Sequence, residues 1–283
     1  MEMKELDRSY IRSLIKNRPD NATKHDFGHA LIIAGSKGKM GAAILASKAA
    51  LVSGCGLLTS HIPARGEVIL QSTIPEAMAS LSEFNDRIGD LPELNCFTGI
   101  GIGPGIGSEE PVGQVIQQLL QRISSPIVID ADAINWLSNK RELINQIPQN
   151  AILTPHGREF QRLIGKSLIN EDLTKIQREW SIEHNVIIVR KCHNTVITDS
   201  DGTVYINTSG NSGLAKGGSG DVLTGMITSF LAQGYSPIES ALIGTFIHGK
   251  AADIAIRSIN ENALLASNVI ESISEAFNEI GTN

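Results

Sequence analysis

The chain has 283 residues, and 24 lysines and arginines against 30 aspartates and glutamates give a formal net charge of −6. This acidic balance argues against a nucleic-acid-binding surface, and a hydrophobic content of 41% excludes a disordered chain. At roughly 100–200 residues per domain, the length allows one large domain or two small ones. The 27 glycines, beside only 4% aromatic residues, suit a fold whose backbone approaches phosphate groups closely.

The cysteines and the first residues indicate a cytoplasmic protein. Cys55, Cys96 and Cys192 are far apart and form no C-x-x-C pair, so we expect free thiols in a reducing compartment. Residues 1–8 are polar and acidic and lack the apolar core of a secretory signal. No run approaches the ~18 uninterrupted apolar residues of a membrane span. We therefore expect neither secretion nor membrane insertion.

The predicted elements alternate along the chain. In the first half we expect, in order, a helix at 5–17 that Pro19 ends, a strand at 30–34, a helix at 41–52, strands at 57–62 and 96–100, a helix at 109–122, a strand at 127–130 and a short helix through Trp136. In the second half we expect a strand at 151–154, a helix at 171–184, strands at 186–189, 195–198 and 203–206, and helices at 222–231, 237–257 and 263–280.

Short apolar strands separated by helices imply an α/β fold with a mainly parallel sheet covered by helices on both faces. Residues 199–202 form the expected turn of a hairpin. The sequence contains no linker, repeat or low-complexity segment, so we expect a single domain over residues 1–283 and no separate lid domain. The glycine loops follow the strands, at the sheet edge where ligands of such folds bind.

Several common catalytic motifs are absent. Gly99–Pro104 places proline where the dinucleotide fingerprint needs its third glycine, and Phe160 replaces the first glycine of a P-loop that would end at Ser167. Asp221 replaces the last glycine of a nucleophile elbow, and no H-E-x-x-H occurs. These absences count against a dehydrogenase, a P-loop enzyme, a serine hydrolase and a zinc protease.

The segment that carries the clearest chemical signal is the glycine-rich run at 207–225, which has five glycines between positions 210 and 220. A predicted buried helix begins directly after them. Glycines before a helix leave backbone N–H groups free to converge on an anion, and the helix dipole adds about half a positive charge there. Asp221, at the helix start, is then either a general base beside a bound phosphate or a helix cap.

A set of segments together resembles the ADP-dependent NAD(P)H-hydrate dehydratases of the ribokinase-like superfamily. Gly217–Asp221 resembles the G-x-G-D anion hole and base of ribokinase-like enzymes. The other segments are Gly28–Ser36, Met40–Ala43, Gly101–Gly107, Asp130–Ala133 and Leu153–His156. Two positions depart from the family pattern: Gly157-Arg158 replaces Pro-Gly after His156, and Cys192 stands where a glycine often follows the lysine.

The resemblance implies a ribokinase-like fold and a hydro-lyase that repairs damaged cofactor. Such an enzyme dehydrates (6S)-NADHX or NADPHX to NADH or NADPH while ADP is cleaved to AMP and phosphate, with Mg²⁺ as cofactor. The implied partners are an NAD(P)H-hydrate epimerase and further copies of the chain, because relatives form tetramers. We expect the helices at 237–257 and 263–280 to be exposed and available for that interface.

The resemblance also implies roles for single residues. Asp221 is the implied base and contacts the hydrate, and Glu159 is the implied magnesium residue, acting through water. The other implied hydrate-binding residues are Ala42, Ala43, Gly105 and His156. The implied nucleotide- and phosphate-binding residues are Lys191, Cys192, His193, Asn194, Thr195, Gly217, Gly218, Ser219 and Gly220.

Alternatives stay open for most of these residues. His156 is also explained by a helix cap or the core, Glu159 by a surface helix turn, and residues 191–195 by an ordinary β-turn. Tight helix–sheet packing explains the small residues Ala42, Ala43 and Gly105. Asp130 and Asp132 either order magnesium or cap the next helix, and Lys216 either neutralises phosphate or is solvated. The rival functions are a small-molecule kinase, such as a hydroxyethylthiazole kinase, and a nucleotide-binding regulator without catalysis.

Overall fold

The computed structural model describes residues 3–166 and 172–281. In these residues ten strands form one sheet in the order β1-β10-β9-β8-β7-β6-β5-β2-β3-β4. β9 runs antiparallel to β8 and β10, and the other neighbours are parallel. The strands are β1 (Lys4–Glu5), β2 (His29–Ile33), β3 (Leu57–Ile62), β4 (Met78–Leu81), β5 (Gly99–Ile102), β6 (Ile127–Ile129), β7 (Ile152–Leu153), β8 (Ile187–Arg190), β9 (Thr195–Thr198) and β10 (Val204–Asn207).

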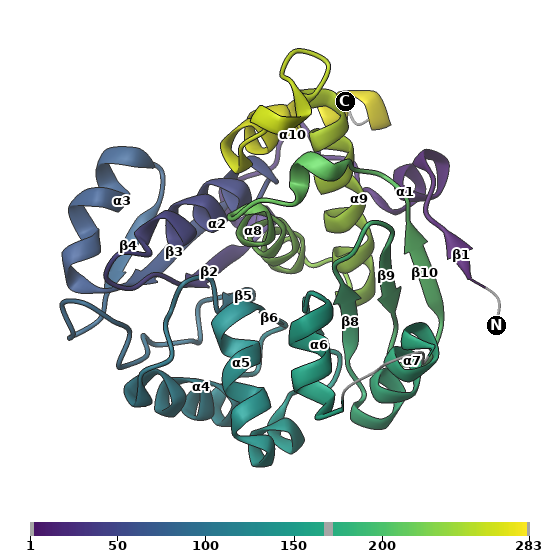
Figure 1. Cartoon of the computed structure of the whole chain (residues 1–283). Helices are drawn as coiled ribbons and strands as arrows, with labels where there is room; N and C mark the ends of the chain where they lie inside the picture. Colours follow the sequence, from purple (N-terminus) through teal and green to yellow (C-terminus); the bar gives the residue numbers. More distant parts are fainter. Residues whose placement is uncertain (1–2, 167–171, 282–283) are drawn as a thin grey trace.

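Helices cover both faces of this sheet, as Figure 1 shows. They are α1 (Arg8–Leu14), α2 (Met40–Val52), α3 (Glu67–Thr73), α4 (Glu110–Arg122), α5 (Ala131–Asn139), α6 (Gly157–Ile164), α7 (Leu173–His184), α8 (Ser219–Ala232), α9 (Pro237–Ala255) and α10 (Ala266–Ile280). Helices α4 to α7 pack on one face around Phe160 and Leu137, and α8, α9 and α10 pack on the other around Phe230. The predicted mainly parallel α/β fold is confirmed.

The first element differs from the prediction of one helix at 5–17. Lys4 and Glu5 pair with β10, and the side chain of Asp7 accepts a hydrogen bond from the N–H of Tyr10 at 2.8 Å, which caps a helix that begins at Arg8. The helix ends at Leu14, before Pro19. The N-terminal capping signal of Asp7 was present in the sequence, but pairing of a two-residue strand depends on a partner about 200 residues away, which local pattern does not report.

Further differences lie at the edges and at the C-terminal helices. The short elements α3 and β4 were not predicted, because β4 is partly exposed and shows no apolar alternation. The predicted exposure of a helix at 237–257 is wrong: α9 is buried through most of its length, including Phe246 and Ile247. Residue 171, the predicted start of the helix at 171–184, lies outside the described residues, and α7 accounts for most of the rest.

Helix α8 lies in direct backbone contact with its neighbours. A Cβ added at Gly225 of α8 would lie 2.0 Å from the main-chain oxygen of Ala46 in α2. A Cβ added at Gly99 of β5 would lie 2.5 Å from the main-chain nitrogen of Ala232 in α8. These glycines let the helix sit against the sheet and against α2, and they fix where its first turn emerges. None of the helices in the described ranges has the length and hydropathy needed to cross a bilayer.

Replacing Gly225 with alanine is expected to lower the free energy of unfolding by about 1–3 kcal/mol, because a main-chain atom of α2 must move to admit the new methyl group. Gly41→Ala in α2 is the matched control, since a Cβ at Gly41 meets no atom within 4 Å. That control should leave stability unchanged or raise it by up to about 1 kcal/mol. Urea unfolding measures both, and equal stabilities for the two variants would contradict the proposed close contact.

Candidate active site

A cavity of about 730 Å³ opens at the carboxyl edge of the sheet. It is bounded by Asp130 after β6, the turn after β8, the segment at 209–218 and the first turn of α8. Ten of the residues predicted to form the site line it: His156, Lys191, Cys192, His193, Thr195, Gly217, Gly218, Ser219, Gly220 and Asp221. The fold therefore brings the glycine-rich run and the turn after β8 together, as the sequence predicted.

The start of α8 is built to receive an anion. Gly218 is the N-cap residue and has a φ of 98°, a left-handed conformation that favours glycine. Within the described residues, the main-chain N–H groups of Gly217, Gly218, Gly220 and Asp221 donate to no other group. Free donors at the positive end of a helix dipole bind phosphate oxygens.

Asp221 is the third residue of α8 and does not cap it, so the helix-cap alternative is wrong. The cap position belongs to Gly218, and the Asp221 side chain forms no hydrogen bond with the described part of the chain. Burial, helped by the nearby charge of Asp130 and opposed by Lys191, raises the pKa of Asp221 to about 7. A carboxyl group with this pKa exchanges its proton near neutral pH, which suits a general base.

Lys191 points toward the start of α8 rather than into solvent. Its Nζ atom lies 2.7 Å from Oδ1 of Asp130. The same atom lies 3.1 Å from the place that a Cβ on Gly220 would occupy. The turn after β8 thus delivers an ammonium group beside the free N–H groups of the glycine-rich loop. Asp130 is the N-cap residue of α5 but forms no capping hydrogen bond with its side chain, so it does not serve as a side-chain cap.

His156 and Glu159 form a reciprocal capping box at the start of α6. Nδ1 of His156 accepts hydrogen bonds from the N–H groups of Arg158 and Glu159, and Oε2 of Glu159 accepts one from the N–H of His156 at 2.8 Å. The Glu159 side chain is only 8% exposed, so the surface-turn explanation for it is wrong, whereas the capping explanation for His156 is confirmed. The His156 ring is half exposed and lines the cavity, so its cap role leaves it open to a ligand.

The described residues contain no cluster of three His, Cys, Asp or Glu side chains that could hold a metal ion. Oε2 of Glu159 accepts a hydrogen bond from the main-chain N–H of His156, and Oε1 of Glu159 lies 3.5 Å from Nε2 of the His156 ring. The donor set therefore does not fit a magnesium ion bound directly by protein side chains. It leaves room only for an ion that carries most of its ligands as water and phosphate oxygens.

A second group of predicted residues lies where the loop after β5 meets the start of α2. Gly105 has a φ of 61°, and a Cβ there would lie 3.0 Å from Cβ of Ala42. Ser36 donates a hydrogen bond to the Gly105 carbonyl at 2.7 Å. Ala43 is completely buried in the core, which supports the packing explanation for that residue. Asp132 connects the two groups, because it accepts from the N–H of Gly107 and its charge contributes to the raised pKa of Asp221.

Five of the predicted site residues lie outside the lining of the large cavity. They are Ala42, Ala43, Gly105, Glu159 and Asn194. Cys192 does not adopt a positive φ, so the departure from glycine does not distort the turn. Lys216 is exposed, lines the cavity and donates a hydrogen bond to the carbonyl of Asn262.

Sequence reasoning missed two residues of α9 that line the cavity, Thr245 and His248. Both are at least nine-tenths buried, and Oγ1 of Thr245 and Nε2 of His248 have no hydrogen-bond partner in the described part of the chain. Burial lowers the pKa of His248 to about 4, so the ring is neutral at physiological pH. The available signal was that 240–249 contains no aspartate, glutamate, lysine or arginine, which favours a buried helix.

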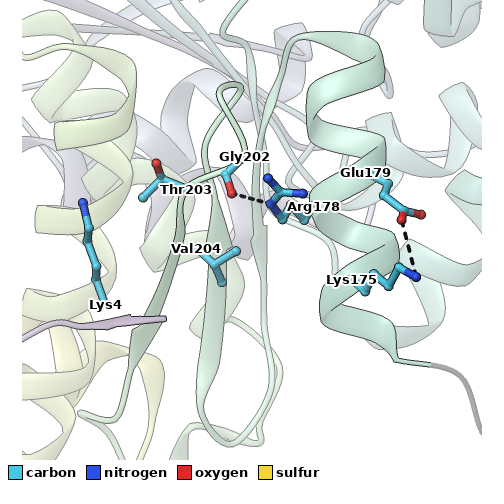
Figure 2. Close-up of a pocket in the computed structure, with 7 residues that line it drawn as sticks. All are labelled: Lys4, Lys175, Arg178, Glu179, Gly202, Thr203 and Val204. Carbon is cyan, nitrogen blue, oxygen red and sulfur yellow. Dashed lines mark hydrogen bonds and ion pairs between the residues drawn. The ribbon is translucent and has the colours of Figure 1, made fainter. Parts of the chain in front are cut away.

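A shallower hollow of about 590 Å³ lies elsewhere, between α7 and the hairpin of β9 and β10 (Figure 2). It contains three cationic side chains, but each has a partner. Arg178 donates to the Gly202 carbonyl at 2.8 Å, Lys175 lies 4.0 Å from Glu179, and Lys4 lies over the Tyr205 ring. None of the predicted site residues lines this hollow, so it is not the candidate site.

Comparison with known proteins identifies the family. Residues 30–275 match the sequence profile of the NAD(P)H-hydrate dehydratase family. The chain belongs to this family. It is 35% identical to an ADP-dependent (S)-NAD(P)H-hydrate dehydratase from Neisseria meningitidis, over 91% of this chain and 86% of that relative. It is also 35% identical to a bifunctional NAD(P)H-hydrate repair enzyme from Moorella thermoacetica, of which it spans only 52%.

A solved structure of a ribokinase-like superfamily protein from Enterococcus faecalis superposes on this dehydratase-family chain with a TM-score of 0.87 at 28% identity, over 99% of this chain and 97% of that chain, so the fold is ribokinase-like. The structure of an ADP/ATP-dependent NAD(P)H-hydrate dehydratase from Bacillus subtilis, co-crystallized with ATP/Mg²⁺, superposes with a TM-score of 0.86 at 29% identity, and the match covers 99% of both chains. A hydroxyethylthiazole kinase from Pyrococcus horikoshii superposes with a TM-score of 0.60 at 13% identity, over 88% of both chains. The likeness to this kinase is one of fold alone.

Proposed function

We propose that this chain catalyses the ADP-dependent dehydration of (6S)-NADHX and NADPHX to NADH and NADPH, with release of AMP and phosphate. The observation that carries the proposal is the position of Asp221, a carboxyl group with a pKa of about 7, next to the free N–H groups of the glycine-rich loop. The Neisseria meningitidis relative and the Bacillus subtilis structure are named for this activity and match nearly the whole chain, which supports the proposal. The hydroxyethylthiazole kinase is only 13% identical and shares the fold alone.

The reaction needs two steps. In the first, Asp221 takes the proton of the ring hydroxyl, the hydroxyl oxygen bonds to the β-phosphorus of ADP, and the bond to the bridging oxygen breaks so that AMP leaves. The N–H groups of Gly217, Gly218 and Gly220, together with the ammonium group of Lys191, stabilise the charge on the moving phosphoryl group. In the second step the ring nitrogen's electron pair expels phosphate, and the adjacent ring carbon loses a proton to complete the double bond.

The two residue groups supply the two halves of this site. The turn at 191–195 and the glycine-rich loop form the nucleotide side, and Ala42, Gly105 and His156 form the hydrate side. Ala43 supports the hydrate side from within the core rather than by contact, because its side chain is completely buried. Asp221 lines the cavity of the nucleotide side, and it feels the charge of Asp132, which bonds to Gly107 in the loop of the hydrate side. This placement suits a base that acts on one substrate beside the phosphate of the other.

Mg²⁺ enters this proposal as a companion of the nucleotide. One carboxylate oxygen of Glu159 is engaged by the capping contact, so we assign Glu159 a part in holding the ion through water, and the phosphates would supply the direct oxygens. The ion would add positive charge at the phosphates during transfer. A cytoplasmic location, an NAD(P)H-hydrate epimerase as functional partner and a homotetramer complete the proposal. The exposed side of α10 remains the helix face available for assembly, since α9 is buried.

The nucleotide requirement is the first test of this function. We expect NADHX to be converted to NADH with ADP and not without nucleotide, and excess EDTA to abolish the activity until Mg²⁺ is added back. The absorbance of the reduced nicotinamide measures the rate. Equal or higher activity with ATP would place the enzyme with the ATP-using branch. Full activity in EDTA would remove the metal role of Glu159, and accumulation of a stable phosphorylated product would indicate a kinase instead.

Asp221→Asn keeps the shape of the side chain and removes the base. We expect kcat to fall by about 10²–10⁴-fold, the usual contribution of a positioned base. AMP affinity should stay equal or rise, because a negative charge beside the phosphate is gone. In the wild type, kcat/KM should decline as the pH falls below about 7, because the raised pKa protonates the carboxyl group there. Turnover equal to that of the wild type, with matched urea unfolding, would end the assignment of Asp221 as the base.

Gly105→Val tests the hydrate side separately from the nucleotide side. A β-branched residue at a φ of 61° that also meets Ala42 should distort the loop and raise KM for the hydrate about tenfold or more, with AMP affinity nearly unchanged. Gly38→Val is the matched control, because Gly38 has a φ of 78° but no neighbour within 4 Å. If AMP binding falls in parallel with hydrate binding, the variant has disturbed the fold and Gly105 serves packing alone.

A further inference from the structure

The Asp130 side chain is buried, and both of its carboxylate oxygens accept hydrogen bonds. The residue is 1% exposed. Oδ1 accepts from Nζ of Lys191 at 2.7 Å, and Oδ2 accepts from Oγ1 of Thr224 at 2.7 Å. Thr224 belongs to α8, one turn after Asp221, and Lys191 follows β8, so this single carboxylate joins three separate elements. The residue after it, Ala131, has a φ of 49°, which is rare for a residue other than glycine, asparagine or aspartate and marks local strain.

The reach of Lys191 explains why such an anchor is needed. β7 lies between β8 and β6 in the sheet, so the Lys191 side chain extends across the end of β7 to reach Asp130. Its main chain is held in place, because its N–H donates to the Pro155 carbonyl at 2.9 Å and it bridges to His156. A long, flexible lysine stem loses this extended position readily unless a fixed anion holds its end.

We propose that Asp130 is a positioning residue, which holds the ammonium group of Lys191 at the start of α8, between the phosphate-binding glycines and the carboxyl group of Asp221. The inference rests on the proposed function for the identity of the phosphate and of the base. The placement of Lys191 itself is independent of that function. Asp130 acts through Lys191 and Asp221 and does not contact the reacting atoms.

The charges around Asp221 set the expected consequences. The facing charged residues are Asp130 after β6, Asp132 of α5 and Lys191 after β8. The other titratable groups that line the same cavity are His156, Cys192, His193, Lys216 and His248. The negative charge of Asp130 disfavours ionisation of Asp221, and Lys191 favours it. Removing the Asp130 charge therefore lowers the pKa of Asp221 directly, and it also frees Lys191 to pair with Asp221. Both effects have the same sign.

The experiment compares three variants of the full chain. Titration of ¹³C-labelled aspartate carboxyl groups by NMR, with the Asp221 signal assigned from Asp221→Asn, reports the pKa in the ligand-free protein. We expect Asp130→Asn to lower the pKa of Asp221 by about one unit or more and Lys191→Gln to raise it by a similar amount. Thr224→Val is the matched control: it removes a hydrogen bond to the same carboxylate without changing any charge, so the pKa of Asp221 should stay at the wild-type value.

Activity gives the second readout. In Asp130→Asn the acidic limb of the kcat/KM profile should move to lower pH, while kcat at high pH falls by about 10²-fold because the ammonium group is misplaced. Shifts of the same sign in Asp130→Asn and Lys191→Gln, an equal shift in Thr224→Val, or no shift with only a loss of stability would overturn the proposal. If the wild type shows no dehydration, the proposed function fails, whereas the NMR titration still decides the role of Asp130. Lys191→Gln decides it if Asp130→Asn does not fold.

Discussion

The close contact of α8 with the sheet and with α2 is the constraint on which the rest of the site depends. No side chain separates the backbones at Gly225 and Gly99, where an added Cβ would meet main-chain atoms of Ala46 and Ala232. The position of the α8 axis relative to β5 is therefore fixed, and this fixes where the first turn of α8 lies at the carboxyl edge of the sheet. This packing of α8, rather than the loop before it, sets the positions of the free N–H groups and of the Asp221 carboxyl group.

The features that reduce stability gather at the same edge. One cavity is surrounded by the unpaired N–H groups at the start of α8 and the partly buried carboxyl group of Asp221. The strained Ala131 and the unpartnered polar atoms of Thr245 and His248 line the same cavity. The well-packed cores on both faces of the sheet offset this local destabilisation, because burial of apolar surface there stabilises the folded chain. Such a concentration of strain and unsatisfied groups is typical of a functional site.

Local pattern predicted what depends on local pattern. The apolar runs gave β3 within its observed bounds, and the glycine-rich run before a helix predicted the anion site at Gly217–Gly220. Local pattern does not report contacts between distant segments, and Asp130 and Lys191 are 61 positions apart. From the sequence, Asp130 was therefore explained either as a magnesium residue or as a helix cap. The burial of α9 was missed for a different reason, because the helix was expected to form a surface for assembly although 240–249 carries no aspartate, glutamate, lysine or arginine.

The distribution of charge also explains how one carboxyl group serves as the base between two anionic substrates. An aspartate beside a phosphate repels it, but burial raises the pKa of Asp221 to about 7 and so weakens this repulsion. Nucleotide binding would raise the pKa of Asp221 further if the new negative charge were unbalanced. The ammonium group of Lys191, held by Asp130, balances it. Asp130 itself opposes ionisation of Asp221, so its contribution is to fix the position of the Lys191 ammonium group and not to lower the pKa of Asp221. The base, the phosphate loop and the end of β6 are therefore electrostatically coupled.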